Sequence, residues 1–231
     1  GIHPSEGVIE ILYRVVGRGT WLLSQLGPGA SVSLVGPLGN SFEIESAGAG
    51  EVAIVAGGIG IAPLLPLIEN LLGSRAGSRD QASVHLFYGA RSGGELLPAD
   101  TLEREGLRVH WSTDDGSFGH RGFVTQLLAG AVDGGALDPT VVLACGPLPM
   151  QYHVARWALA RNIPAQLSLE SLMACGFGAC LGCALPAHHP HDPTADHYVH
   201  VCKDGPIFPA GIIQWSKIRL HPTAPPTYPC V

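Results

Sequence analysis

EVAIVAGGIGIAPLLPLI, residues 51–68, is the stretch that decides the fold, because an apolar run leads there directly into a glycine-rich turn. Residues 52–68 hold no charged side chain and are almost numerous enough to cross a bilayer. Glycines and prolines interrupt the run, however, and valine and alanine dominate its first part whereas leucine dominates its second. This order is typical of a buried strand that leads into a helix, so we expect a globular chain with no membrane span.

The alternation of strand and helix continues along the chain after this stretch. Apolar runs typical of strands cover residues 52–56, 83–88, 107–111, 140–145 and 165–169. Stretches with helical periodicity lie between them, at residues 62–72, 122–129 and 149–161. Such an order predicts a doubly wound α/β domain over residues 49–170.

The chain on either side of this domain has other patterns. In residues 1–48, strand-like runs at 8–16 and 30–35 alternate with turn pairs, which predicts an antiparallel sheet or β-barrel with one short helix at residues 20–26. Residues 171–231 are rich in cysteine, glycine, histidine and proline, which predicts a small irregular domain. The expected fold class is therefore β plus α/β, in three parts.

Composition limits the kinds of partner. The formal net charge of -6 and the pI near 6.0 leave no basic stripe for a nucleic-acid backbone, so nucleic acid is not an expected partner. Six cysteines would allow three disulfides, but three of them lie within nine residues, a spacing that suits metal binding better than the stapling of distant segments. We therefore expect a reducing, cytoplasmic location.

The strongest motif is Cys175-x4-Cys180-x2-Cys183, followed after eighteen intervening residues by Cys202. This spacing is that of plant-type ferredoxins, in which four thiolates hold a 2Fe-2S cluster. Interspersed glycines let the backbone curl and aim its N–H groups at the sulfurs. Structural zinc is the alternative, but zinc sites usually pair their ligands in two short C-x2-C units, whereas here the last cysteine stands alone.

The second motif, GGIGIAP at residues 57–63, follows the first strand of the α/β domain. Glycines permit a tight turn there, and N–H groups at a helix start attract a pyrophosphate. Pro63 suits a first-turn position but replaces the third glycine of the usual fingerprint, so the motif alone also fits a packing turn. The loops at 88–91 and 144–147 also follow predicted strands, where open α/β sheets bind ligands.

Taken in order, the motifs resemble those of a known family. They are LYRVVGxGT (12–20), GPLGN (36–40), GGIGxAP (57–63), YGAR (88–91), TDDGSxG (113–119), ACGP (144–147), SLESxMACGxGACxxC (168–183) and VCxDGPxF (201–208). The chain resembles the electron-transfer subunits of class B dihydroorotate dehydrogenases, in the ferredoxin-NADP reductase superfamily. The block at 168–208 is the most specific part, since it distinguishes the family from reductases without a C-terminal cluster.

For the flavin, the resemblance implies that Leu12, Tyr13 and Arg14 lie along FAD and that Gly19 and Thr20 contact its pyrophosphate. Leu12 would equally suit the core of any barrel, whereas the guanidinium of Arg14 suits a phosphate partner. The family's Arg-Pro-x-Ser flavin clamp is absent and would fall before the first residue. We therefore expect the sequence to be a fragment of a longer chain, and whether the fragment alone retains FAD stays open.

For the nicotinamide dinucleotide, the resemblance implies three groups of residues. Gly58, Gly60 and Pro63 would lie at the pyrophosphate, and Cys145 and Gly146 would lie at the nicotinamide ring, with Cys145 as the catalytic residue. A strand-end cysteine is also commonly a small buried hydrophobe. The resemblance further implies that Asp114 meets the adenosine ribose, where a carboxylate favours NAD(H) over NADP(H). The alternative is that residues 114–117 form a simple turn.

The implied function is electron transfer. In the resembling family, dihydroorotate is oxidised at the FMN of a separate catalytic subunit, and electrons pass through the 2Fe-2S cluster and FAD to NAD+, in pyrimidine biosynthesis. FAD is needed because a nicotinamide exchanges two electrons as a hydride whereas a cluster passes one. Two alternatives stay open: a related flavin reductase that serves another partner, and a non-enzymatic zinc-binding interaction module.

Histidines gather between the third and fourth ligand cysteines, at His188, His189, His191, His197 and His200. A second metal site is conceivable there. Prolines at positions 190 and 193 interrupt the cluster, however, so we interpret it as a solvated, variable loop.

Overall fold

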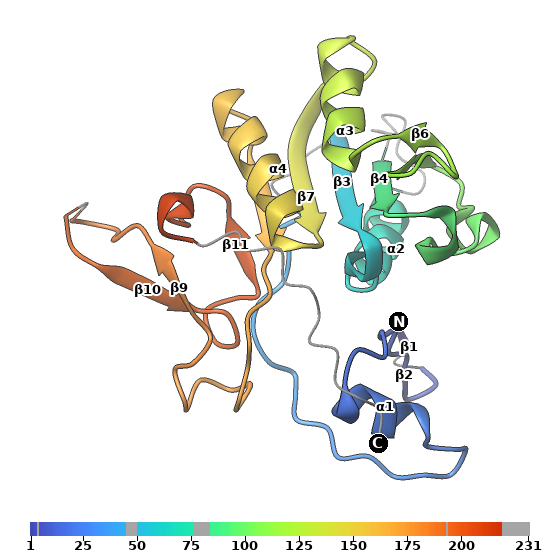
Figure 1. Ribbon diagram of the computed structural model, residues 1–231, viewed down its shortest axis with the longest axis vertical. Coiled ribbons are helices and arrows are strands. Elements are labelled where there is room, and N and C mark those ends of the chain that lie inside the picture. Colours follow the sequence, from blue (N-terminus) through green and yellow to red (C-terminus); the bar gives the residue numbers. More distant parts are fainter. Residues whose placement is uncertain (4, 45–49, 76–83, 193, 219–231) are drawn as a thin grey trace.

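A seven-stranded sheet forms the centre of the computed structural model, which describes residues 1–3, 5–44, 50–75, 84–192 and 194–218 (Figure 1). Its strand order is β11-β8-β7-β3-β4-β5-β6, and all neighbours are parallel except β11, which is antiparallel to β8. The strands are β3 (Glu51–Gly57), β4 (Val84–Ala90), β5 (Leu107–Thr113), β6 (His120–Arg121), β7 (Pro139–Cys145), β8 (Ala165–Ser168) and β11 (Ile207–Pro209).

Helices cover both faces of this sheet, as Figure 1 shows. Helix α2 (Leu64–Arg75) packs on the face formed by the even-numbered residues of β3, and helices α3 (Val124–Asp133) and α4 (Leu148–Ala160) pack on the other face. The β3 residues 52–56 are fully buried because both of their faces are covered. The five strands and three helices predicted for the α/β region are confirmed, with ends shifted by a few residues.

The order of the strands creates a switch point between β3 and β7. The chain moves from β3 outward to β4 and β5 and then returns to β7 and β8 on the other side. The strand ends approach closely at this point, because a Cβ at Gly60 would lie 2.6 Å from the carbonyl carbon of Cys145 and 2.7 Å from Cα of Gly146. Only glycine fits there. Open α/β sheets bind their ligands at such a point.

The turn after β3 differs slightly from the expected one. A 3-10 turn, Gly58–Ile61, separates the strand from α2, and Gly58 has a φ of 54°, which favours glycine. Pro63 therefore directly precedes α2, although it was expected inside the first turn.

The partial, N-terminally truncated β-barrel expected for residues 1–48 is not confirmed in the described residues 1–3 and 5–44. Two short strands, β1 (Ile2–His3) and β2 (Val8–Ile9), pair antiparallel, and the rest of the runs at 8–16 and 30–35 is not strand. Apolar side chains of this segment stay exposed, including Val15 at 50% and Leu34 at 63%. A two-stranded pair without further neighbours has little stability of its own, which explains why an alternating pattern alone does not produce a sheet here.

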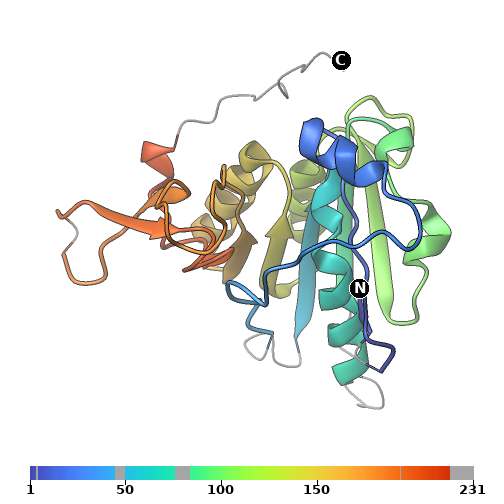
Figure 2. The ribbon, with the colours of Figure 1, turned by 90° about the horizontal axis from the view of Figure 1, so that it is seen from below.

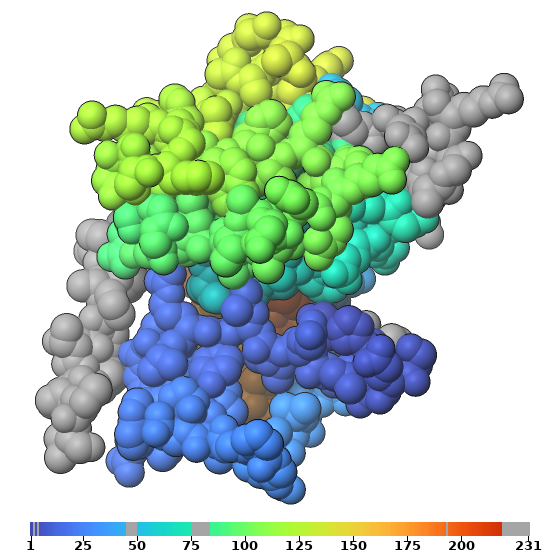
Figure 3. Space-filling model, turned by 90° about the vertical axis from the view of Figure 1, so that its right-hand side faces the viewer, coloured from blue at the N-terminus to red at the C-terminus, as the bar shows by residue number. Residues whose placement is uncertain are grey.

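The predicted short helix is confirmed as α1 (Arg18–Ser24), which begins two residues earlier than expected. The segment that contains it lies at the carboxyl ends of β3 and β4, and Figure 3 shows the segment in blue against the α/β part in cyan and green.

The region after β8 folds onto the sheet. Strands β9 (Ala184–Ala187) and β10 (His197–His200) form an antiparallel hairpin that extends to one side (Figure 2). Its base shares a core with α4, since Cys183, Val201 and Phe208 belong to the same cluster of buried residues as Val154. The structure therefore has a hairpin and one strand of the main sheet in residues 171–218, a region for which few regular elements were predicted. The domain boundaries at 48 and 170 stay a prediction.

Asn40, the last residue of the GPLGN motif, ties the N-terminal segment to this region. Its amide donates to the carbonyl oxygens of Asp204 (3.1 Å) and Ile207 (2.9 Å), and its side-chain oxygen accepts from the N–H of Ile207 at 2.9 Å. Three hydrogen bonds from one amide fix the segment beside the last strand. Among the residues that the structure describes, no helix is long and apolar enough to cross a bilayer.

Candidate functional site

The four motif cysteines lie at one end of the β9–β10 hairpin. Cys175 and Cys180 are in the loop that follows β8, Cys183 directly precedes β9 and Cys202 follows β10. Because Ala184 pairs with His200, the hairpin brings Cys183 and Cys202 together, and their sulfurs are 3.2 Å apart without a disulfide. Both of these side chains are buried, whereas Cys180 is exposed.

Backbone N–H groups point at the sulfurs. The N–H of Cys180 donates to Sγ of Cys175 (3.4 Å), that of Gly182 to Sγ of Cys180 (3.5 Å) and that of Cys202 to Sγ of Cys183 (3.5 Å). The loop turns tightly enough for this because Gly176, Gly178 and Leu181 have positive φ. Donors of this kind stabilise thiolates, the form that binds metal.

The same donors shift the acidity of two thiols. Hydrogen bonds from the N–H groups of Cys180 and Phe177 lower the pKa of Cys175 to about 6. The N–H of Cys202 lowers the pKa of Cys183, while the shared contact with Cys183 raises the pKa of Cys202. The lowered pKa values favour the thiolate form of Cys175 and Cys183.

Four cysteines near the base of the hairpin are a donor set that fits a 2Fe-2S cluster. The sulfurs of Cys183 and Cys202 are in contact, and the backbone N–H of Cys180 connects that residue to the sulfur of Cys175. In the described part of the chain, no group of three or more His, Cys, Asp or Glu side chains is gathered closely enough to hold one metal ion. A cluster with two irons takes two thiolates on each. Ligation by these four residues remains a proposal.

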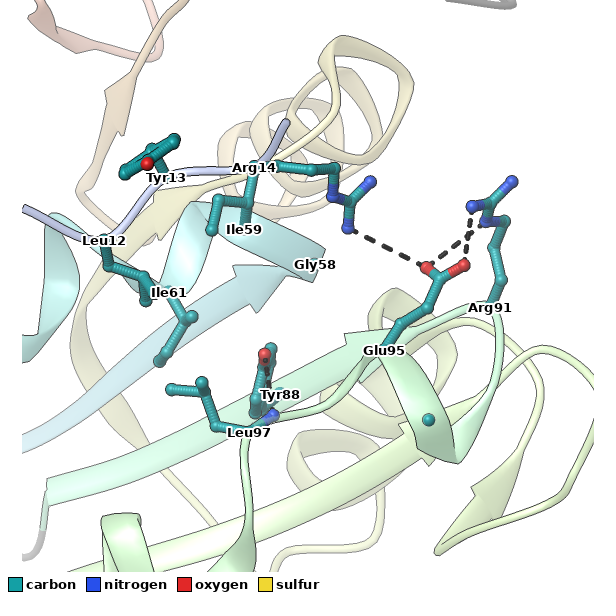
Figure 4. Close-up of a pocket in the computed structure, with 11 residues that line it drawn as sticks. Leu12, Tyr13, Arg14, Gly58, Ile59, Ile61, Tyr88, Arg91, Glu95 and Leu97 are labelled. Atoms are coloured by element: carbon teal, nitrogen blue, oxygen red, sulfur yellow. Dashed lines mark hydrogen bonds and ion pairs between the residues drawn. The ribbon is translucent and has the colours of Figure 1, made fainter. Parts of the chain in front are cut away.

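A pocket of about 370 Å³ opens where the N-terminal segment meets the sheet (Figure 4). Three groups of residues line it: Leu12, Tyr13 and Arg14 from the N-terminal segment, Gly58, Ile59 and Ile61 from the turn after β3, and Tyr88, Arg91, Gly94, Glu95 and Leu97 from β4 and the loop after it. The structure therefore brings the residues expected at the flavin next to the glycine turn expected at the dinucleotide.

One end of this pocket is apolar and the other is charged. Leu12, Ile61 and Leu97 lie at the apolar end, and the hydroxyl of Tyr88 accepts a hydrogen bond from the N–H of Leu97 at 3.3 Å. Burial raises the pKa of Tyr88, so its hydroxyl stays protonated. The charged end holds Arg14 and Arg91. An apolar wall beside the guanidinium of Arg14 suits an aromatic ring linked to phosphate, as in FAD or NAD.

The sequence analysis expected a ligand at the loop of residues 88–91, which includes Tyr88, but it missed Glu95 as a lining residue. The YGAR motif at residues 88–91 ends β4, and this position was the one available signal for Tyr88. Glu95 lies beyond the motif in an irregular loop, and the fold alone brings it to the pocket.

Several of the expected cofactor residues lie outside this pocket. Thr20 is in α1, and its hydroxyl already accepts from the N–H groups of Val16 (2.9 Å) and Gly17 (3.2 Å). Gly19 lies beside it with open space at its Cα, Pro63 precedes α2, and Asp114 is exposed in the loop after β5. The proposed contacts of these residues with FAD and NAD stay predictions.

Cys145 and Gly146 end β7 at the switch point. The thiol of Cys145 is 2% exposed, and burial raises its pKa to about 11. Gln151 holds the neighbouring backbone, because its amide donates to the carbonyl oxygens of Gly146 and Ser168, each at 2.8 Å. A neutral, buried thiol suits the wall of a nicotinamide site better than proton transfer, and its catalytic role stays a prediction.

We expect Cys145 to resist alkylation in the folded protein. A pKa near 11 leaves about one thiol in a thousand ionised at pH 8. Peptide mapping after iodoacetamide treatment at pH 8 should find Cys145 unmodified in the native protein and modified after unfolding in urea. Rapid native labelling would contradict the buried, neutral thiol.

The histidines lie along the hairpin. His197 and His200 are in β10, and His188, His189 and His191 are in the connection between the strands. Nδ1 of His189 accepts from the N–H groups of His191 (3.2 Å) and Asp192 (2.9 Å), so this nitrogen stabilises a turn. The interpretation as a solvated loop stays a prediction.

Comparisons with known proteins agree in one family. A model of the iron-sulfur cluster binding domain of dihydroorotate dehydrogenase B matches residues 170–214, and a model of an oxidoreductase NAD-binding domain matches residues 54–156. "Dihydroorotate dehydrogenase B (NAD(+)), electron transfer subunit" from Desulforamulus reducens is 38% identical over 93% of this chain and 77% of its own length. The protein of that name from Clostridium acetobutylicum is 36% identical over 87% of this chain and 72% of its own length.

A solved structure extends the likeness to three dimensions. The NADH-dependent reduced ferredoxin-NADP oxidoreductase, from a study of flavin-based electron bifurcation, superposes with a TM-score of 0.76. It is 29% identical, and the match covers 93% of this chain and 71% of that chain. The architecture is therefore that of the ferredoxin-NADP reductase-like enzymes, with a mixed sheet in an α/β arrangement.

Proposed function

The chain belongs to the family of electron-transfer subunits of NAD+-dependent dihydroorotate dehydrogenase B, and we propose that the residues described above build its electron path. It is an NAD-linked oxidoreductase subunit with a 2Fe-2S cluster, FAD and NAD as cofactors, in pyrimidine biosynthesis. The observation that supports the proposed path is the contact between the sulfurs of Cys183 and Cys202 at the hairpin base, with Cys175 and Cys180 linked in the preceding loop.

Cys175, Cys180, Cys183 and Cys202 hold the cluster, and the N–H groups of Cys180, Gly182 and Cys202 stabilise the thiolates. Bound FAD supplies the conversion between single electrons and a hydride. Leu12, Tyr13 and Arg14 line its site from the N-terminal segment.

At the switch point, Gly58 and Gly60 let a pyrophosphate approach the backbone at the end of β3. The buried end of β7, at Cys145 and Gly146, forms the wall beside the nicotinamide ring and excludes water from it. Asp114 is the proposed contact with the adenosine ribose of NAD, and Pro63 is a proposed contact with its pyrophosphate. Gly19 and Thr20 are the proposed contacts with the pyrophosphate of FAD.

The partner is an FMN-containing catalytic subunit, in a hetero-oligomer, and it docks at the cluster loop. Apolar side chains are exposed around Cys175 and Cys180: Leu172 at 93%, Phe177 at 57% and Leu181 at 59%. An apolar patch beside an electron carrier suits a protein partner, because an electron must leave near the surface. The proposed location is the cytoplasm, where thiols stay reduced.

Reconstitution tests this function. The holoprotein is combined with the FMN subunit, and NAD+ reduction by dihydroorotate is followed at 340 nm. We expect strong stimulation over the FMN subunit alone. The absence of stimulation would contradict the function, and electron transfer between NADH and ferredoxin in its place would indicate the related reductase role.

We expect Arg14→Ala to weaken FAD retention by about tenfold, because one charge-assisted phosphate contact contributes about 1.4 kcal/mol or more. Flavin released on dialysis, measured by fluorescence, checks this. Arg104→Ala is the matched control, since Arg104 is exposed and does not line the pocket. Equal retention in both variants would contradict the contact.

A further inference from the structure

A single carboxylate lies between two arginines at the charged end of the pocket. Glu95 accepts from Arg91 through both oxygens, with Nη2 to Oε1 at 2.5 Å and Nε to Oε2 at 3.3 Å (Figure 4). Its Oε2 is also 3.9 Å from Nη2 of Arg14. Glu95 is 27% exposed, whereas the Arg91 side chain is 75% exposed. Glu95 thus engages a cation that otherwise faces solvent.

Arg91 stands where the loops after β4 and β5 meet. The N–H of Asp114 donates to the carbonyl oxygen of Ala90 (3.0 Å), and the N–H of Asp115 donates to that of Arg91 (3.2 Å). The N–H of Gly93 donates to Oγ of Ser117 at 2.8 Å. These bonds hold Arg91 and Glu95 beside the loop that contains Asp114.

The charges of these two loops interact. Burial raises the pKa of Asp114, Asp115 and Glu95 raise it further, and Arg91 opposes them. A phosphate on the 2'-hydroxyl of a bound adenosine would meet these carboxylates at close range. Two arginines lie at these loops: Arg121 packs against Gly116, and Arg91, whose charge acts on Asp114, is already engaged by Glu95. Planar guanidinium is the group that recognises phosphate best.

We propose that Glu95 contributes to nucleotide selectivity by holding Arg91 in a bidentate ion pair, so that a 2'-phosphorylated adenosine meets repulsion and the guanidinium of Arg91 is not free to bind it. The inference rests on the proposed function, since it places the adenosine end of the dinucleotide at these loops. It adds a second determinant of NAD over NADP selectivity to the Asp114 carboxylate.

Glu95→Gln tests the proposal in the holoprotein. Gln keeps the size of the side chain but removes the charge, which frees Arg91 and lowers the repulsion. We expect the ratio of kcat/KM for NADPH to that for NADH, with an artificial electron acceptor, to rise by about fivefold, within the range of a surface ion pair. Calorimetry should show a similar gain in affinity for adenosine 2',5'-bisphosphate over 5'-ADP.

Two further variants complete the test. Glu95→Gln combined with Arg91→Gln should lose the gain, because the guanidinium that Glu95→Gln frees is then absent. Asp133→Asn, which breaks the distant Asp133–Arg161 pair of 2.8 Å, should leave both ratios unchanged. The proposal would be overturned if Glu95→Gln left the NADPH-to-NADH ratio unchanged or abolished binding of both adenosine 2',5'-bisphosphate and 5'-ADP. It would also be overturned if the gain persisted in the double variant that lacks Arg91. Failure of the unaltered holoprotein to bind NADH or 5'-ADP would overturn the proposed function itself, and the inference with it.

Discussion

The substitution Cys183→Ser is expected to abolish electron transfer from dihydroorotate to NAD+. The sulfur of Cys183 is 3.2 Å from that of Cys202 and accepts the N–H of Cys202, so its removal leaves one iron with a single thiolate. We expect loss of the cluster's visible absorbance and of labile sulfide. The dihydroorotate-dependent rate should fall by about two orders of magnitude or more, because FAD then receives no single electrons.

Two variants separate this effect from misfolding. Cys183 is buried in the core, whereas Cys180 lies in an exposed loop, so Cys180→Ser should lose the cluster with little change in the free energy of unfolding. Cys145→Ser removes a thiol at the end of β7, outside the four-cysteine motif, and the variant should keep its iron and sulfide. Both cluster variants should still oxidise NADH with an artificial acceptor, since FAD and the dinucleotide site remain. A full complement of iron in Cys183→Ser would contradict the assignment.

Gly60→Ala is expected to have the second largest effect. The added Cβ would contact the carbonyl oxygen of Cys145 and would lie 2.7 Å from Cα of Gly146, and backbone atoms at a strand end move only with the strand. We expect the free energy of unfolding to fall by about 2 to 3 kcal/mol. The affinity for NADH should fall by about tenfold or more, because the same shift disturbs the pyrophosphate turn.

Gly73→Ala is the matched control for this substitution. Gly73 lies in α2, and nothing stands within 4 Å of a Cβ added there. Alanine in a helix interior is expected to stabilise the protein by about 0.5 to 1 kcal/mol. Urea unfolding and NADH titration of both variants check the pair. A fully stable Gly60→Ala protein with unchanged NADH affinity would show that the switch point tolerates a side chain.

The α/β core was predictable because its signals are local. The run at 52–56 is apolar on both faces, and the glycine turn that follows it marks the start of a strand-to-helix connection. The cysteine motif was equally local, since three of its four members lie within nine residues. These features depend on spacing along the chain, which the sequence states directly.

The other features of the fold and of the candidate site depend on contacts between segments that are distant in the sequence. Alternation at 8–16 predicted strands, yet in the described residues strand forms there only at Val8–Ile9, because a strand exists only with a neighbour to pair with. Glu95 has no motif, and its place between Arg14 and Arg91 follows from how two loops and the N-terminal segment meet. The pairing of Cys183 with Cys202 likewise needs the β9–β10 hairpin.

Iron located by anomalous diffraction tests the central assignment most directly. Crystals of the anaerobically prepared holoprotein, measured at the iron absorption edge, should show two iron peaks beside each other at the hairpin base. We predict one peak between the sulfurs of Cys175 and Cys180 and the other between those of Cys183 and Cys202. A single peak surrounded by all four sulfurs, zinc at that point, or iron bound away from any of the four cysteines would contradict the account.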